Sequence, residues 1–171
     1  MGYLAHATIE FLQSHAGWAA PVVFALAFCE SFAFVSLIVP ATVILVGVGG
    51  LIGASGIAFW PVWLGAALGA IVGDWLAYSL AYRFKDQIVT WWPLSRDPRL
   101  VKRGMAFFER WGVLAVFFGR FLGPLRAVVP IAAGMCGMPW PNFQFANVAS
   151  AIVWATGILA PGAVSVRWLI G

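Results

Sequence analysis

Four ionisable side chains interrupt stretches of this chain that are otherwise apolar enough to lie inside a membrane, namely Glu30, Asp74, Arg120 and Arg126. The sequence around them is devoid of charge, since residues 31–73 and 127–166 contain no Asp, Glu, Lys or Arg. One charge at the centre of a bilayer costs about 2.5–3.5 kcal/mol on insertion scales, so such charges pair with one another or line a hydrated cavity. Two acids and two arginines balance in sign. The pattern predicts a polar site inside the membrane, and with it transport or translocation.

The composition places the whole chain in a membrane. Of its 171 residues, 63% are hydrophobic and 9% are charged, whereas about a quarter of the residues in a soluble domain are charged. The apolar runs are long and continuous, which is typical of buried or membrane helices. We therefore expect an all-α integral membrane protein in which residues 1–171 form a single membrane domain.

Positive charge is concentrated in one segment. Seven of the ten Lys and Arg residues fall within residues 83–110, and none precedes position 83. The positive-inside rule places such a segment on the cytoplasmic side, so we expect a basic cytoplasmic loop over residues 83–104 that contacts anionic lipid headgroups. A short loop beside the bilayer argues against nucleic-acid binding. The two Cys and two His residues show no metal-binding spacing, and neither a cofactor nor a metal is expected.

The long apolar segments are of two kinds. Residues 60–82 and 140–162 each have the length of a spanning helix, which needs about 20 residues. Residues 18–56 are too long for one crossing and are broken by Pro40 and a run of glycines, which favours a re-entrant helical hairpin. Residues 3–15 carry apolar side chains on one stripe, as does a helix that lies in the membrane interface.

A second interrupted stretch covers residues 119–138, where small and helix-breaking residues recur: Gly119, Gly123, Pro124, Pro130, Gly134 and Gly137. We expect these residues to break the helix at several points. The first spanning segment instead has a regular repeat of glycines, at Gly65, Gly69 and Gly73. Their four-residue spacing predicts a smooth face for close helix contact.

The two halves of the chain share a plan. A shift of 90 positions places Glu30 on Arg120 and Pro40 on Pro130, and in each half a Gly-rich stretch and a spanning helix follow. We interpret two segments as pseudo-repeats, residues 18–82 and residues 108–168. Inverted repeats with broken helices that meet at the midplane are typical of secondary transporters. If the halves are inverted, Glu30 and Arg120 would face each other across a pseudo-twofold axis.

The spacing of the two arginines determines whether their side chains can meet. Arg120 and Arg126 are six residues apart, which is about 240° around an ideal helix, so a straight helix would point them in different directions. Pro124 and Pro130 each lie four residues after one of them, where a proline ring clashes with the carbonyl group. Both prolines therefore predict breaks that let the guanidinium groups converge. Such a planar fork can bind two phosphate oxygens at once, and the alternative is a structural salt bridge from each arginine to an acid.

Two uncharged polar residues accompany these charges. Tyr78 lies four residues after Asp74, and we expect it to pack beside that residue and to hydrogen-bond its carboxylate. Asn147 has two interpretations, as a residue that lines the site or as one that forms an interhelical hydrogen bond.

These segments resemble a known family. The sequence RFLGPLRAVVPIAAGMCGMP over residues 120–139, followed by Phe143, Asn147 and Trp154, resembles the signature of the DedA family of SNARE-associated, VTT-type membrane proteins. The sequence GAIVGD over residues 69–74, with Tyr78, resembles the family's Gly-Asp segment. Glu30 and Pro40 resemble its first re-entrant segment. Nearly the whole chain takes part in the resemblance.

The resemblance implies a bacterial inner-membrane protein that moves lipid phosphates between leaflets, notably undecaprenyl phosphate, and that has two re-entrant segments of opposite orientation. It implies that the two arginines bind the headgroup, with Asn147 beside them, and that Glu30 and Asp74 carry protons driven by the membrane gradient. Many family members have an acidic residue just after the first re-entrant proline, where this chain has uncharged Ala41 and Thr42. The effect of Thr42 on coupling stays open.

Other functions also stay open. A membrane lipid phosphatase usually needs a His nucleophile or a metal-binding acidic cluster, and both His residues lie in the N-terminal segment. A proton-coupled transporter of a small solute or cation would favour an excess of acids over arginines. A membrane assembly factor would use the charges for structure alone. We expect a transport protein and no enzyme, with a polyprenyl phosphate or another anionic phospholipid as partner and a homo-oligomer left open.

Overall fold

The computed structural model describes residues 16–32, 42–55, 58–91, 95, 97–123 and 125–170. In chain order its helices are α2 (Ala19–Ser31), α4 (Thr42–Ser55), α5 (Phe59–Phe84), α6 (Pro98–Trp111), α7 (Val113–Gly119), α8 (Leu125–Met135) and α9 (Trp140–Ile170), with short 3-10 helices η1 (Ala16–Trp18) and η2 (Lys85–Thr90). These segments contain no strand, as predicted for an all-α protein. The predicted interfacial helix over residues 3–15 lies outside the described residues, as do Pro40 and Pro124.

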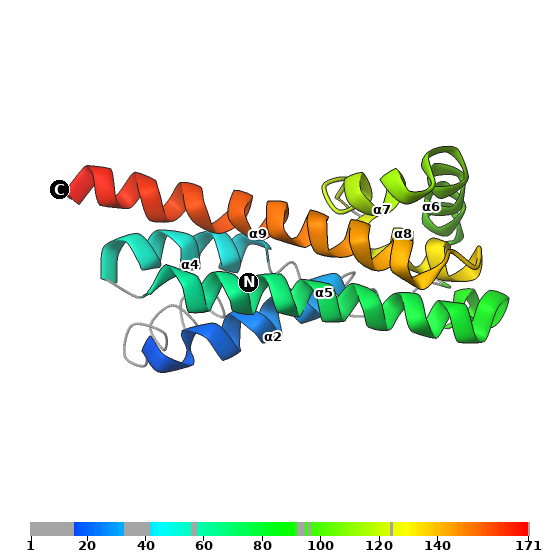
Figure 1. Ribbon diagram of the computed structural model, residues 1–171, viewed down its shortest axis with the longest axis horizontal. Helices are drawn as coiled ribbons and strands as arrows, with labels where there is room; N and C mark the ends of the chain where they lie inside the picture. Colours follow the sequence, from blue (N-terminus) through cyan, green and yellow to red (C-terminus); the bar gives the residue numbers. More distant parts are fainter. Residues whose placement is uncertain are drawn as a thin grey trace.

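The long helices α5 and α9 form the axis of the molecule. They lie side by side and run in opposite directions (Figure 1), and the indole nitrogen of Trp63 donates a hydrogen bond of 2.9 Å to the hydroxyl of Thr156. Among the described helices, these two are long and apolar enough to cross a membrane. The predicted helix over 60–82 is thus confirmed, and the one over 140–162 is longer than predicted, because α9 continues through Pro161 to Ile170.

Pairs of shorter helices pack on opposite ends of this axis (Figure 1). At one end α2 packs on α5 and α4 packs on α9; at the other, α7 packs on α9 and α8 packs on α5. Each half of the chain therefore places one short helix on its own long helix and one on the long helix of the other half. The connection between α2 and α4, residues 33–41, lies outside the described residues.

The predicted glycine face of α5 packs against α2. A Cβ atom added at any of its three glycines would collide with a carbonyl oxygen of α2: Gly65 with Ala20, Gly69 with Phe24 and Gly73 with Phe28. At Gly73 the separation would be 2.8 Å, well inside ordinary van der Waals contact. Because glycine has no Cβ, the two backbones can approach this closely. The predicted packing role is confirmed.

The predicted loop over residues 83–104 contains more structure than expected. It includes η2 and the first turns of α6, which lies across the bundle (Figure 1). The start of α6 has a standard N-terminal signal, because the Asp97 carboxylate accepts a hydrogen bond of 3.1 Å from the amide of Leu100 and Pro98 occupies the first turn. The helix ends at Gly112, whose φ of +53° favours glycine.

The predicted interruption over residues 119–138 is confirmed in part. The chain leaves regular helix at residues 120–123 and 136–139, where Gly123 and Gly137 lie. The predicted breaks at Pro130 and Gly134 are wrong, because both residues lie inside α8. Pro130 falls in the second turn of α8, where its missing N–H removes one intrahelical hydrogen bond near the free end. Gly134 allows close packing, since a Cβ there would lie 2.8 Å from the Cβ of Ala81 on α5.

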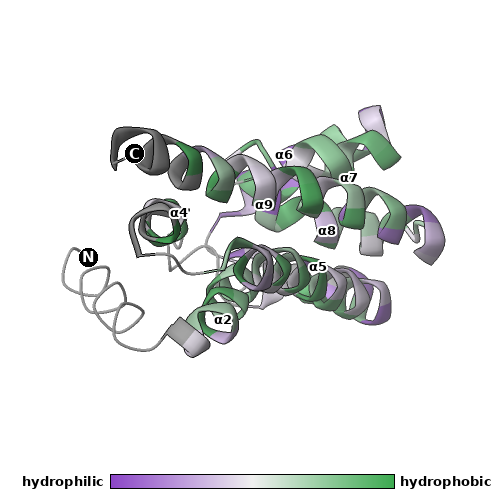
Figure 2. Cartoon of the chain, turned by 60° about the vertical axis from the view of Figure 1, so that its left-hand side comes forward, coloured by the Kyte–Doolittle hydropathy of each residue, from purple (hydrophilic) through white to green (hydrophobic). Residues whose placement is uncertain are grey.

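A polar layer crosses the middle of an apolar interior. Buried apolar residues form one cluster between α2, α4, the first half of α5 and the second half of α9, and two clusters around the other halves of α5 and α9. Asp74 lies between the buried Ala70 and Ala77 of different clusters, and Ser150 borders the buried Ala151. Hydrophobic residues also cover much of the outer surface of α5 and α9 (Figure 2).

Candidate functional site

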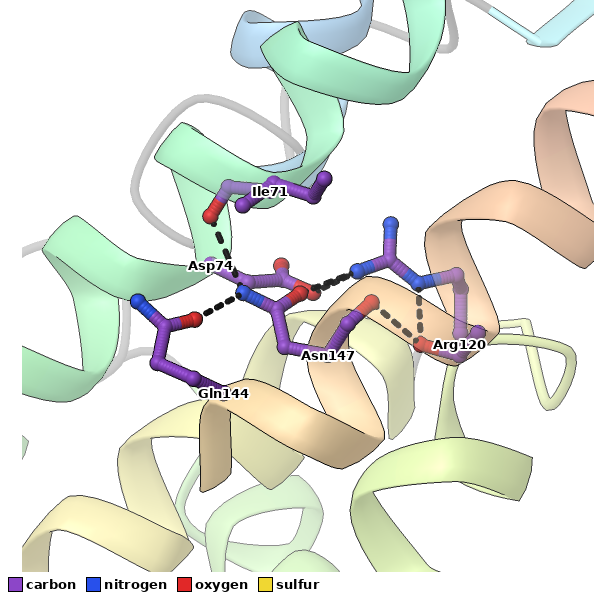
Figure 3. A network of polar contacts seen from close by, with 6 residues as sticks. Ile71, Asp74, Arg120, Gln144 and Asn147 are labelled. Carbon is purple, nitrogen blue, oxygen red and sulfur yellow. Dashed lines mark hydrogen bonds and ion pairs between the residues drawn. The ribbon is translucent and has the colours of Figure 1, made fainter. Parts of the chain in front are cut away.

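Arg120 is the centre of a buried hydrogen-bond network between α5 and α9 (Figure 3). It follows the last residue of α7. Its Nη2 donates to the Asp74 carboxylate at 2.5 Å and to the side-chain oxygen of Asn147 at 2.6 Å, and its Nε donates to the hydroxyl of Ser150 at 3.0 Å. All four residues are buried. A charged pair with further hydrogen bonds of this kind can exist in an apolar interior.

The orientation of Asn147 is fixed by its remaining contacts. Its Nδ2 donates to the backbone carbonyl of Ile71 on α5 at 3.0 Å and to the side-chain oxygen of Gln144 at 3.1 Å (Figure 3). These contacts leave its oxygen turned toward Arg120. Asn147 therefore forms the predicted interhelical hydrogen bond, from α9 to α5, and also contacts the charged cluster through Arg120.

A second ion pair joins α8 to α2. Nη1 of Arg126 donates to the carboxylate of Glu30 at 2.9 Å. The same guanidinium group lies over the indole ring of Trp154 on α9, 5.1 Å from its centroid. A cation in this position is attracted by the negative face of the ring. Arg126 thus contacts two further helices, each carrying a residue that favours its positive charge.

The two ion pairs share one electrostatic environment, because Arg126 also interacts through charge with Asp74 and Arg120. The structure thus gathers the four charges singled out in the sequence. Their pairing differs from the predicted apposition of Glu30 and Arg120. The turn after α7 directs Arg120 toward α5, and α8 then begins with Arg126 facing the end of α2.

Both arginines keep a buried nitrogen that donates no hydrogen bond to any residue that the structure describes. These atoms are Nη1 of Arg120 and Nη2 of Arg126. Buried polar atoms nearly always have a partner, and those without one need an explanation. A guanidinium group can donate but cannot accept, so a further partner of either nitrogen would be an acceptor such as water or the oxygen of an anion.

Tyr78 lies apart from the charged network. Its hydroxyl donates to the backbone carbonyl of Met138 at 2.6 Å, and its ring stacks on Phe143 with centroids 4.1 Å apart. The predicted hydrogen bond to Asp74 is therefore wrong. One turn of α5 separates the two side chains, and the segment before α9 supplies a better acceptor to the tyrosine.

The sequence prediction missed several members of the site. The missed residues are Gln144 and Ser150, together with the ring contact of Trp154. On α9 there was a signal, because Gln144, Asn147 and Ser150 recur every three residues and share one face. Among the described residues, no group of three or more His, Cys, Asp or Glu could hold a metal ion.

Known proteins match most of the chain. The VTT domain model matches residues 39–164. Inner membrane protein YabI of Escherichia coli is 33% identical over 153 residues, which are 90% of this chain and 60% of that protein. An uncharacterized membrane protein of Mycobacterium tuberculosis is 36% identical over 140 residues, 76% of this chain and 64% of that protein. An uncharacterized membrane protein of Buchnera aphidicola is 30% identical over 144 residues, 84% and 56% of the two chains.

This chain therefore spans less than two thirds of the length of these relatives. No solved structure matches it.

Proposed function

This chain belongs to the VTT domain family of membrane proteins, and we propose that it moves a lipid phosphate between the two leaflets of a membrane. Undecaprenyl phosphate is the cargo we expect. The observation that carries the proposal is the pair of buried guanidinium groups with donors that have no partner among the described residues. Such groups suit an anionic headgroup, while the surrounding apolar surface suits its tail.

The charges of the site fit a monophosphate. A phosphomonoester carries about −1.5 to −2 charge at neutral pH, close to the combined charge of two arginines. In the observed state the two carboxylates already balance these arginines. A bound headgroup would therefore replace at least one carboxylate, and Arg126 is the more accessible, with 12% of its side chain exposed against 2% for Arg120.

This replacement offers a route to proton coupling. When a phosphate takes the place of Glu30 on Arg126, the carboxylate loses a neighbouring positive charge in an apolar region. Such a group favours its neutral, protonated form. Release of the phosphate would restore the ion pair and free the proton. Uptake and release on opposite sides of the membrane would connect transport to the proton gradient.

The helix arrangement supports a site open in turn to each leaflet. We propose that α2 with α4 and α7 with α8 are re-entrant hairpins of an inverted pseudo-repeat, entering from opposite sides. Asp74 lies ten residues before the end of α5, and Ser150 lies ten residues after the start of α9. At 1.5 Å per residue this is about 15 Å, half of a hydrocarbon layer about 30 Å thick.

The basic segment sets the proposed orientation. η2 and α6 carry five of the ten Lys and Arg residues and would face the cytoplasm. The membrane would be the bacterial inner membrane, crossed by α5 and α9.

The proposal is tested by headgroup translocation in reconstituted vesicles. We compare Arg126→Ala and Arg126→Lys with Arg110→Ala, which removes an exposed arginine from α6. Translocation of polyprenyl phosphate should stop in Arg126→Ala, be reduced in Arg126→Lys because the planar fork is lost, and persist in Arg110→Ala. A folded Arg126→Ala protein that transports at the full rate would overturn the proposal. Phosphatidylglycerol, tested in parallel, shows whether the cargo is a monoester.

A further inference from the structure

Ser31 is a buried hydroxyl that no part of the proposed mechanism has used. It is the last residue of α2, and 2% of it is exposed. Its Oγ has no hydrogen-bond partner among the described residues. A buried hydroxyl without a partner lowers the stability of the fold, so its presence needs a reason.

Other hydroxyls on these helices behave differently. Four of them donate to a backbone carbonyl three or four residues earlier: Ser79 to Trp75, Thr90 to Gln87, Ser150 to Asn147 and Thr156 to Ile152. This local bond is the usual solution for Ser and Thr in a helix. Ser31 does not form it, and its hydroxyl remains available to a group outside its own helix.

Ser31 lies next to residues of both ion pairs. It directly follows Glu30, the partner of Arg126. A Cβ atom built on Gly73 would lie 2.9 Å from the Cβ of Ser31, and Gly73 directly precedes Asp74, the partner of Arg120. Ser31 thus neighbours one acid directly and packs against the residue beside the other, and the arginine paired with each acid keeps a buried nitrogen without a described partner.

We propose that the Ser31 hydroxyl is a third donor of the phosphate site, beside Nη1 of Arg120 and Nη2 of Arg126, and that the three together select a terminal phosphomonoester over a phosphodiester. A monoester presents three free oxygens, one for each donor. A diester has only two, and its second substituent would occupy the space of the third. This inference rests on the proposed function and adds a residue and a selectivity to it.

The test measures binding to the purified full chain in detergent, with farnesyl phosphate and its methyl diester as probes. In the wild-type protein the monoester should bind at least about tenfold more tightly, which is the scale of one hydrogen bond to a charged group. Ser31→Ala should weaken monoester binding about tenfold and leave diester binding unchanged. Ser79→Ala, which removes a hydroxyl bonded to its own helix, is the matched control.

Thermal unfolding separates binding from structure. Because Ser31→Ala removes a buried polar group without a described partner, the variant should unfold at the same temperature as the wild type or higher. A lower unfolding temperature together with equal losses for both probes would assign Ser31 a structural role and overturn the inference. Equal binding of the two probes by the wild type, or full monoester affinity in Ser31→Ala, would overturn it while leaving the proposed function intact. A wild-type protein that binds neither probe would overturn both this inference and the proposed function.

Discussion

Asp74 and Arg120 lie 46 residues apart in the chain, and their side chains meet at 2.5 Å with almost no exposed surface. The pair joins α5 to the turn after α7, and the other hydrogen bonds of Arg120 extend it to α9. In an apolar interior neither charge is tolerable alone, because desolvation costs several kcal/mol per ion. The stability of the helix arrangement should therefore depend on both members being present.

The losses of stability from removing Asp74 and from removing Arg120 should not add. Asp74→Ala leaves Arg120 with a buried, uncompensated charge, and we expect a loss of about 3–5 kcal/mol in the free energy of unfolding. The double variant Asp74→Ala/Arg120→Met should lose less than the sum of the two single losses. Unfolding of the wild type, the single variants Asp74→Ala and Arg120→Met, and the double variant in the same detergent provides the measurement. Additive losses would show that the pair contributes no coupling energy.

Trp154 should stabilise the charge of Arg126 and not only fill space. A desolvated cation–π contact contributes about 2 kcal/mol, so Trp154→Leu should destabilise the wild type by that amount beyond its packing loss. In an Arg126→Gln background the extra loss should disappear, because no cation remains over the ring. In the protein that keeps Arg126, Trp154→Phe should lose less stability than Trp154→Leu, because a phenyl ring still attracts the cation. If Trp154→Leu lowers the free energy of unfolding equally in both backgrounds, the tryptophan contributes by packing alone.

The sequence could predict which residues form the site, but not how they pair. A charge within an apolar run is visible in the sequence and has few stable solutions, and the spanning segments follow from length alone. Which arginine pairs with which acid depends on the direction in which the chain turns between α7 and α8, and this direction cannot be read from the sequence. The sequence predicts a break at Pro130, yet α8 begins only five residues earlier at Leu125 and tolerates the proline.

The partners of uncharged polar residues cannot be predicted from their spacing in the sequence. Tyr78 was predicted from helix spacing to bond Asp74, whereas its acceptor is Met138, 60 residues away in the chain. Such a partner depends on tertiary contacts that spacing cannot reveal. Ser31 also looks ordinary in the sequence, since serines are common in helices and most bond to their own backbone. Only the structure distinguishes Ser31, because it shows that the hydroxyl does not form the local hydrogen bond.

Close packing of α2 on α5 makes Gly69 intolerant of any side chain. In Gly69→Ala the new methyl group would collide with the carbonyl oxygen of Phe24 and lie 3.1 Å from the Cβ of Ala27. We expect a destabilisation of about 1–3 kcal/mol, the usual cost of overpacking. Gly157→Ala on α9 is the matched control, because nothing lies within 4 Å of its added Cβ.

That control should be neutral or stabilising by about 0.5–1 kcal/mol, since alanine favours a helix more than glycine does. Thermal unfolding in one detergent compares the two variants. Equal effects would mean that helix propensity, and not the contact with α2, determines the response at Gly69.

Cys136 can report the orientation of the chain in the membrane. It is exposed in the turn between α8 and α9, next to Gly137, whose added Cβ would lie 3.8 Å from Nζ of Lys85 in the basic segment. In a Cys29→Ser background, a membrane-impermeant maleimide should therefore label it from the cytoplasmic side of oriented vesicles. Labelling only from the opposite side would reverse the proposed topology.

The rate of that labelling should also depend on pH in a defined direction. Partial burial and the nearby Glu109 carboxylate raise the pKa of the Cys136 thiol, and Lys85 lowers it by less. Only the thiolate reacts with maleimide. Labelling near neutral pH should therefore be slower than for a thiol with an ordinary pKa, and the labelling rate should continue to increase at higher pH. Glu109→Gln should shift the rate profile to lower pH and Lys85→Gln to higher pH. Shifts in the same direction for both variants would contradict the charge arrangement around this turn.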